Sequence, residues 1–178
     1  MNTDKDVLVL LTLSEMEQGR LCGIRRSGFS GEINLQDRNG LSGMSEFDRF
    51  KVDIQGCHGE QAASKALNVN WPANYENRGE PDLLLDDGGP CEVRSTHHES
   101  GCLLIRPEEK FMSAPFVLVT GVAPRLMVRG WYIGTDAMKH FQPKRKGDTD
   151  RPPAYWVPQG RLHDIVLLKG CLRTSRSK

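Results

Sequence analysis

Residues 81–94 read Pro-Asp-Leu-Leu-Leu-Asp-Asp-Gly-Gly-Pro-Cys-Glu-Val-Arg, and this stretch carries the strongest structural signal of the chain. A run of three leucines precedes a segment dense in turn residues, and a strand-like alternation follows it. This pattern predicts a β-hairpin whose loop is longer than the two-residue minimum. Asp82 would open the first strand and Glu92 would lie on the second, so the two carboxylates can converge.

Arg94 follows Glu92 by two positions in the second strand of this hairpin. Alternate residues of a strand share a face, so we expect the two side chains to point the same way. Two carboxylates and a guanidinium at one sheet edge can hold a divalent metal ion against a phosphate group. Asp82, Glu92 and Arg94 are therefore the candidate catalytic residues.

The spacing of Pro81-Asp82 and Glu92-Val93-Arg94 resembles the motif of the PD-(D/E)XK nuclease superfamily, with Arg in place of the usual Lys. From about residue 52 to residue 159 the chain is also similar to a group of phage-type proteins. The matching segments are Gly-Glu-x-Ala, Glu-Val-Arg, Leu-Leu-Ile-Arg-Pro, Phe-Val-Leu-Val-Thr-Gly, Val-Arg-Gly-Trp-Tyr-Ile-Gly-Thr-Asp-Ala and Arg-Pro-Pro-Ala-Tyr-Trp-Val-Pro-Gln. The resemblance implies an α+β (α/β) fold with a mixed central sheet of about five strands flanked by helices, in the restriction-endonuclease-like manner.

The same resemblance implies a metal-dependent nuclease that hydrolyses DNA phosphodiester bonds. The metal ligands would be Glu60, Asp82, Glu92 and the backbone carbonyl of Val93, an all-oxygen set that suits one or two Mg²⁺ or Mn²⁺ ions. Arg94 would hold the scissile phosphate. Because Arg stays charged at any working pH, it cannot replace the usual Lys as a general base.

Glu60 lies in a segment, residues 56–67, that reads as a helix. Ala63 and Leu67 share its stripe and indicate that this stripe faces the core. An unpaired carboxylate at the edge of an apolar face is costly, and either a metal ion or an Arg partner would remove that cost. A solvated Glu favoured by the helix dipole in the first turn is the alternative.

The chain has 178 residues and a net charge of +1, which fits one compact domain without a global preference for nucleic acid. We divide it into an N-terminal helical extension (1–50), a core (51–165) and a basic tail (166–178). DNA binding would need a local basic patch. The further candidates for nucleic-acid contacts are His97, His98, Lys144, Arg145, Lys146 and Gln159.

The five cysteines form no Cys-x-x-Cys pair, and residues 7–13 are too short an apolar run to span a membrane. With no secretory signal, these features favour free thiols in a reducing cytoplasm, that of the host cell if the chain is phage-encoded. DNA is the expected partner and no membrane association is expected. A homodimer is one option for the oligomeric state. A zinc site from Cys57 and His58 with Cys91 or the histidines at 97–98 is conceivable, but its spacing fits no standard pattern.

The remaining elements follow from capping signals, alternation and turn residues. A Ser-x-x-Glu pattern at Ser14 predicts a helix over 15–25, a similar pattern at Ser45 predicts a short helix, and Thr135-Asp136 caps a further short helix up to residue 141. Residues 7–13 are either a buried strand or a lead-in to the first helix. Strands are expected over 102–105, 116–120, 126–133 and 154–158, the second and third of these forming a sheet-edge hairpin, with an exposed loop over 28–43.

Two alternatives to the nuclease stay open. A catalytically silent module that binds nucleic acid or protein would keep the fold; Arg94 and the near-neutral charge favour it, whereas the retention of all three acids speaks against it. In an unrelated enzyme or structural phage protein, Glu60, Asp82 and Glu92 would never meet.

Overall fold

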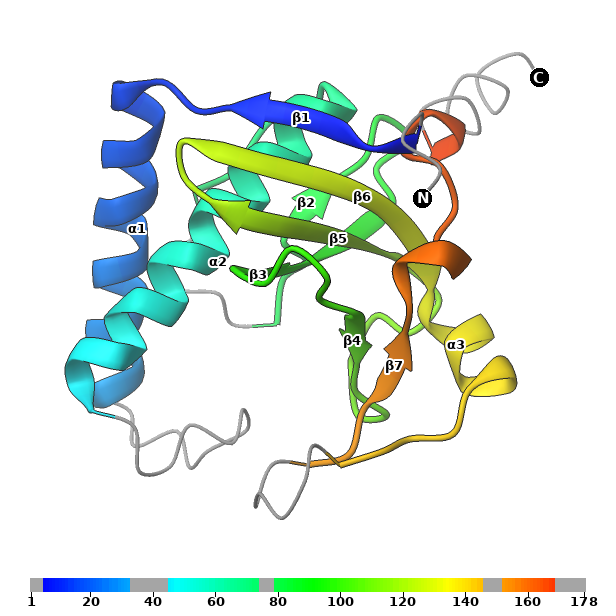
Figure 1. Ribbon diagram of the computed structural model, residues 1–178. Helices are drawn as coiled ribbons and strands as arrows, with labels where there is room; N and C mark the ends of the chain where they lie inside the picture. The colour runs from blue at the N-terminus through cyan, green and yellow to red at the C-terminus, as the bar shows by residue number, and fades with distance from the viewer. Residues whose placement is uncertain (1–4, 33–44, 74–78, 146–151, 169–178) are drawn as a thin grey trace.

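A five-stranded mixed sheet forms the centre of the molecule (Figure 1), in a computed structural model that describes residues 5–32, 45–73, 79–145 and 152–168. Only β3 and β5 run parallel; the other neighbouring strands are antiparallel. This arrangement confirms the α+β class and the mixed sheet of about five strands. In spatial order the strands are β1 (Val7–Leu10), β6 (Arg125–Ile133), β5 (Pro115–Val122), β3 (Pro90–Thr96) and β2 (Leu83–Leu84).

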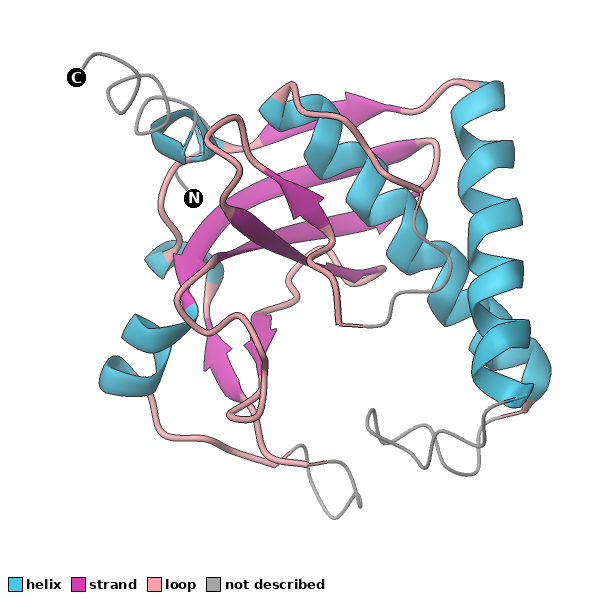
Figure 2. Cartoon of the chain, turned by 180° about the vertical axis from the view of Figure 1, so that it is seen from behind, coloured by secondary structure: helices cyan, strands magenta, loops and turns pink. Residues whose placement is uncertain are grey.

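Two long helices lie together on one side of this sheet, α1 (Leu13–Glu32) and α2 (Glu46–Leu67). Figure 2 shows α2 lying across the face of the sheet and α1 running beside α2 at its outer edge. The smaller elements gather at the opposite end, where α3 (Gly134–His140) lies near a two-stranded sheet of β4 (Leu103–Ile105) and β7 (Tyr155–Val157). Among the described residues, no helix combines the length and apolar character needed to cross a bilayer.

Strand β5 is buried on both faces and separates two hydrophobic cores. Val117 and Val119 face the core beneath α2, whereas Phe116 and Leu118 face a second core that β4, β7 and α3 complete. All four residues are at most 1% exposed, which confirms that this segment is the most deeply buried strand. The predicted β5–β6 hairpin is present, but it lies inside the sheet, because β1 pairs with β6 and takes the edge position.

Helix α1 begins earlier and ends later than the predicted range. The amide of Glu15 donates to Thr12 Oγ1 at 3.2 Å, and the amide of Thr12 donates to Glu15 Oε2 at 2.6 Å. This reciprocal pair is a capping box, so the cap is Thr12 and not Ser14. The helix continues to Glu32 and therefore includes the start of the predicted loop over 28–43; residues 33–44 lie outside the described residues.

Helix α2 is one continuous helix of 22 residues, where we predicted a short helix and a second one from residue 56. Its predicted cap is confirmed, because Ser45 Oγ accepts from the amide of Asp48 at 3.2 Å. The predicted boundary between the N-terminal helical extension and the core, at residue 50, falls inside this helix, and β1 belongs to the central sheet. Helix α3 starts without the predicted side-chain cap.

The hairpin predicted over residues 81–94 is present. Leu83 pairs with Cys91 and Leu84 with Pro90, and the loop is closed by the bond from the Leu85 amide to the Gly89 carbonyl at 2.9 Å. Gly88 has a φ of +80°, which glycine adopts without steric cost. One step further along this antiparallel register, Asp82 lies opposite Glu92.

Candidate functional site

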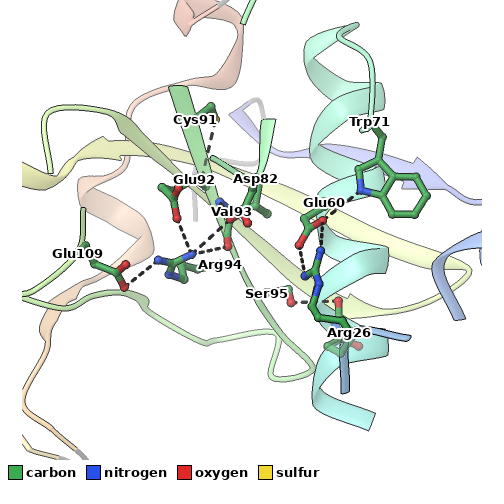
Figure 3. Close-up of polar contacts among 11 residues, drawn as sticks. Arg26, Glu60, Trp71, Asp82, Cys91, Glu92, Val93, Arg94, Ser95 and Glu109 are labelled. Carbon is green, nitrogen blue, oxygen red and sulfur yellow. Dashed lines mark hydrogen bonds and ion pairs between the residues drawn. The ribbon is translucent and has the colours of Figure 1, made fainter. Parts of the chain in front are cut away.

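The hairpin brings Asp82, Glu92 and Arg94 together at one end of β2 and β3 (Figure 3). Arg94 Nη1 lies 3.2 Å from Glu92 Oε2, 3.5 Å from Asp82 Oδ2 and 3.0 Å from the carbonyl oxygen of Val93. Asp82 Oδ2 also accepts a hydrogen bond from the amide of Val93 at 2.8 Å, which fixes this carboxylate against β3. The local register of the hairpin is thus sufficient to assemble these three side chains.

A fourth acid, Glu109, completes the surroundings of Arg94. Its Oε1 lies 2.8 Å from Arg94 Nη2, so the guanidinium bridges Glu109 on one side and the hairpin acids on the other. The guanidinium carbon also lies 5.3 Å from the centre of the Phe116 ring, within the range of a cation–π contact. Glu109 lies in the turn after β4 and was not among the predicted site residues, because no local sequence pattern indicates that an acid in this turn returns to β3.

The electrostatics of the site show a surplus of negative charge. Burial raises the pKa of Asp82 to about 7, and the charges of Glu60 and Glu92 add to this rise, which Arg94 only partly opposes. Burial also raises the pKa of Glu92 above its ordinary value. Burial acts to lower the pKa of Arg94, but the charges of Glu109, Asp82 and Glu92 outweigh it and raise that pKa. Three carboxylates therefore surround one guanidinium.

Glu60 was predicted as a metal ligand, but in the structure its carboxylate forms an ion pair with an arginine. Arg26 of α1 binds it with both Nη atoms, at 2.6 and 3.1 Å, and the indole Nε1 of Trp71 donates to Oε2 at 3.1 Å. Glu60 is 4% exposed and lies on the core stripe of α2 with Ala63 and Leu67, as predicted. A metal ion or an arginine would offset the cost of burying this carboxylate, and the structure shows the arginine.

The close approach of α1 to α2 allows Arg26 to reach Glu60. A Cβ on Gly23 would lie 2.6 Å from the backbone of Ile54, so only glycine fits where the two helices cross. The buried thiols of Cys22 and Cys57 lie beside this crossing, and hydrogen bonding to Cys22 together with burial raises the pKa of Cys57. The Arg26–Glu60 pair is thus part of the α1–α2 interface as well as a neighbour of the site.

The other residues predicted to contact nucleic acid lie outside the cluster of Asp82, Glu92, Arg94 and Glu109. His97 and His98 are exposed after the end of β3, and Lys144 and Arg145 are exposed before β7. Gln159 donates from Nε2 to the carbonyls of Glu99 and Gly101, at 2.6 and 2.9 Å, so its amide holds the loop after β3. Their predicted binding role stays a prediction. Lys146 and the basic tail from residue 169 lie outside the described residues.

No group of three His, Cys, Asp or Glu side chains among the described residues is arranged to hold a metal ion. For the zinc alternative, the ring of His58 bonds instead to the carbonyl of Met16. For the acidic site, Glu60 is turned to Arg26, so the three predicted carboxylate ligands do not form one cage. The oxygens of Asp82, Glu92 and Val93 do admit a cation, because Arg94 Nη1 lies within 3.5 Å of each.

Comparison of the chain with protein-family models, with curated proteins and with solved structures gives no match in any of the three. The likeness to PD-(D/E)XK nucleases therefore stays a prediction that rests on the sequence motif.

Proposed function

We propose that this protein is a metal-dependent nuclease that hydrolyses DNA phosphodiester bonds, of phage or mobile-element type, with a PD-(D/E)XK-like site. One observation carries the proposal: a cationic nitrogen of Arg94 lies within 3.5 Å of Asp82, Glu92 and the Val93 carbonyl. These are the hairpin members of the ligand set that the motif implies. Their oxygens already surround a positive charge in a mostly buried setting, which is the requirement that a cation site must meet.

The charge balance of the cluster fits a divalent ion. Asp82, Glu92 and Glu109 around one guanidinium leave two negative charges in excess when all three are ionised. Asp82, Glu92 and the Val93 carbonyl are the residues that would hold Mg²⁺ or Mn²⁺, since both ions prefer oxygen ligands. When bound, such an ion supplies Lewis-acid activation of water and of the phosphate oxygens.

The side chains of the chain itself would bind and orient the substrate. Arg94 presents a planar, permanently charged fork that matches the oxygens of a phosphate group. It cannot accept a proton, so its part is to hold the scissile phosphate and to stabilise charge that develops there. Glu60, fixed by Arg26 and Trp71, would act on Asp82 through its charge and not as a ligand.

The setting proposed for this activity is the cytoplasm, that of the host cell if the chain is phage-encoded. The four cysteines among the described residues are free thiols, which is the usual state in a reducing compartment.

A catalytically silent module that binds nucleic acid or protein is the second candidate. The observation that favours it is that all three acids of the predicted site already have arginine partners, Glu60 with Arg26, and both Asp82 and Glu92 with Arg94. In such a protein Arg94 would permanently replace the metal ion.

A cleavage assay tests the proposal. Plasmid, linear duplex and single-stranded DNA are incubated with the protein and Mg²⁺ or Mn²⁺, with EDTA as the control for metal dependence. We expect cleavage that disappears with EDTA and with Asp82→Ala. Asp87→Asn is the matched control, because Asp87 lies exposed in the same hairpin loop and should not affect the rate. Absence of cleavage with every substrate and metal would contradict the proposal and favour the silent module.

A further inference from the structure

We propose that Glu109 is a positioning residue that receives Arg94 when a divalent cation enters between Asp82 and Glu92. The inference rests on the proposed metal site and adds an order of events to it: the cation binds first, and only then is Arg94 available to a phosphate group. It rests on how the Arg94 guanidinium is shared between two sets of oxygens.

The first set is the one that a metal ion would use. Arg94 Nη1 contacts Glu92 Oε2 at 3.2 Å, Asp82 Oδ2 at 3.5 Å and the Val93 carbonyl at 3.0 Å. A guanidinium nitrogen and a divalent ion cannot occupy the same oxygens, because two positive charges at contact distance repel strongly in a buried site. Arg94 and the metal ion therefore compete for these oxygens, and Nη1 withdraws from them as the ion binds.

The second set keeps the arginine nearby after it withdraws. Arg94 Nη2 lies 2.8 Å from Glu109 Oε1, a shorter contact than any that Nη1 makes with the hairpin oxygens. The guanidinium carbon lies 5.3 Å from the centre of the Phe116 ring, which packs against the side chain. A rotation about the Glu109 contact would thus release the hairpin acids without sending Arg94 into solvent.

The released arginine would be ready for substrate. Glu109 is 23% exposed in side chain and Arg94 27%, whereas Asp82 and Glu92 are each 10% exposed, so the Glu109 side of the cluster is the one open to an incoming anion. A guanidinium that keeps one carboxylate partner still has donors free for a phosphate oxygen. Binding of the phosphate group is thereby linked to occupancy of the metal site.

The test is a double-mutant cycle on metal affinity, with Mn²⁺ binding followed by electron paramagnetic resonance or calorimetry. The proteins are the wild type, Arg94→Met, Glu109→Gln and the double variant. Removing the competing charge should tighten Mn²⁺ binding at least about tenfold in Arg94→Met, and Glu109→Gln should weaken it about tenfold. In the Arg94→Met background, Glu109→Gln should change the affinity less than about threefold, because its effect runs through Arg94.

Each outcome of this experiment decides something. Mn²⁺ binding by the wild type that Arg94→Met leaves unchanged or weakens would overturn this inference alone and leave the metal site in place. A Glu109→Gln effect that persists in the Arg94→Met background would also overturn it, since Glu109 would then act directly on the ion. No Mn²⁺ binding by any of the four proteins would overturn the proposed function. Binding by Arg94→Met but not by the wild type would support the competition.

Two further proteins keep the result interpretable. Glu108→Gln is the matched control, because Glu108 is the exposed neighbour of Glu109 in the same turn and should leave Mn²⁺ affinity unchanged. Arg94→Gln replaces Arg94→Met if circular dichroism shows that the methionine variant does not fold, and the same increase in affinity is then expected. A loss of Mn²⁺ affinity with Glu108→Gln as large as that with Glu109→Gln would contradict a specific role for Glu109.

Discussion

Replacing Asp82 by Asn should stabilise the folded protein at pH 8 and leave its stability nearly unchanged at pH 4. Asp82 is 10% exposed, and burial together with the charges of Glu60 and Glu92 raises its pKa from 3.8 to about 7. In the folded protein its ionised form is therefore the unfavourable one. Asn cannot ionise, yet its side-chain oxygen can still accept the hydrogen bond from the amide of Val93.

The sign of the effect follows from proton linkage. A carboxyl whose pKa is higher in the folded than in the unfolded state contributes stability that is fully present below pH 3.8. That contribution is lost as the pH rises through about 7, because the folded state must release a proton that it binds more tightly. A pKa raised from 3.8 to about 7 limits the gain in unfolding free energy of Asp82→Asn over the wild type at pH 8 to about 4 kcal/mol, because a difference of one in pKa is worth about 1.36 kcal/mol.

Urea denaturation followed by tryptophan fluorescence at pH 4, 5, 6, 7 and 8 in EDTA measures this difference. We expect the gap in unfolding free energy between Asp82→Asn and the wild type to open between pH 4 and 7 and then to level off. Asp87→Asn is the control: Asp87 accepts the Gly89 amide within the exposed loop, at 2.8 Å, and Asn preserves that bond. Its stability relative to the wild type should not depend on pH.

Two results would refute the reasoning. If Asp82→Asn were less stable than the wild type at pH 8, the pairing of Asp82 with Arg94 would outweigh burial and the neighbouring acids. If the gap were the same at pH 4 and pH 8, Asp82 would not titrate in this range at all. Adding Mg²⁺ at pH 8 supplies a second readout, because an ion that binds the folded state should stabilise the wild type and not Asp82→Asn.

Two further predictions concern the packing that holds the site. Arg26→Met leaves Glu60 buried without its cation and should lower the unfolding free energy by about 3 to 5 kcal/mol, measured by urea denaturation. The double variant Arg26→Met with Glu60→Leu should regain most of this stability. A loss below about 1 kcal/mol in Arg26→Met would contradict a tightly paired Glu60. Gly59→Ala would place a Cβ 2.5 Å from Ser95 Cβ and should destabilise the protein by about 1 to 3 kcal/mol. Gly56→Ala is the control: its Cβ would have its nearest neighbour at 3.9 Å, so this variant should be neutral or slightly stabilising. Equal effects of the two glycine variants on stability would show that α2 is not closely packed on β3 at Gly59.

The hairpin half of the site could be predicted from the sequence because its geometry is local. The turn residues fix the loop, the antiparallel register places Asp82 opposite Glu92, and strand alternation puts Arg94 on the face of Glu92. None of these steps needs knowledge of the distant chain. The same holds for β4, β5, β6 and β7, whose alternation and bounding turns were visible.

The other half could not be predicted, because it depends on contacts between distant segments. Arg26 lies 34 residues before Glu60, on a helix whose length was underestimated, so no local pattern could pair the two. Glu109 reaches Arg94 only because the chain between the parallel strands β3 and β5 passes back over that end of the sheet. The continuity of α2 was missed because Gly56 resembles a helix boundary, whereas the helix runs through it; the small size of Gly59 serves the close packing of α2 on β3.

The two arginines differ in a way that bears on the choice between an enzyme and a silent module. Arg26 binds Glu60 with both terminal nitrogens at 2.6 and 3.1 Å, the geometry of a permanent buried pair. Arg94 instead contacts Asp82 and Glu92 through one nitrogen at 3.5 and 3.2 Å, and its shorter ion pair is to Glu109. A guanidinium that had permanently replaced a metal ion would be expected to hold the hairpin acids as Arg26 holds Glu60. The longer contacts, with Asp82 still carrying a pKa of about 7, leave these acids short of positive charge and favour a site that a divalent cation completes.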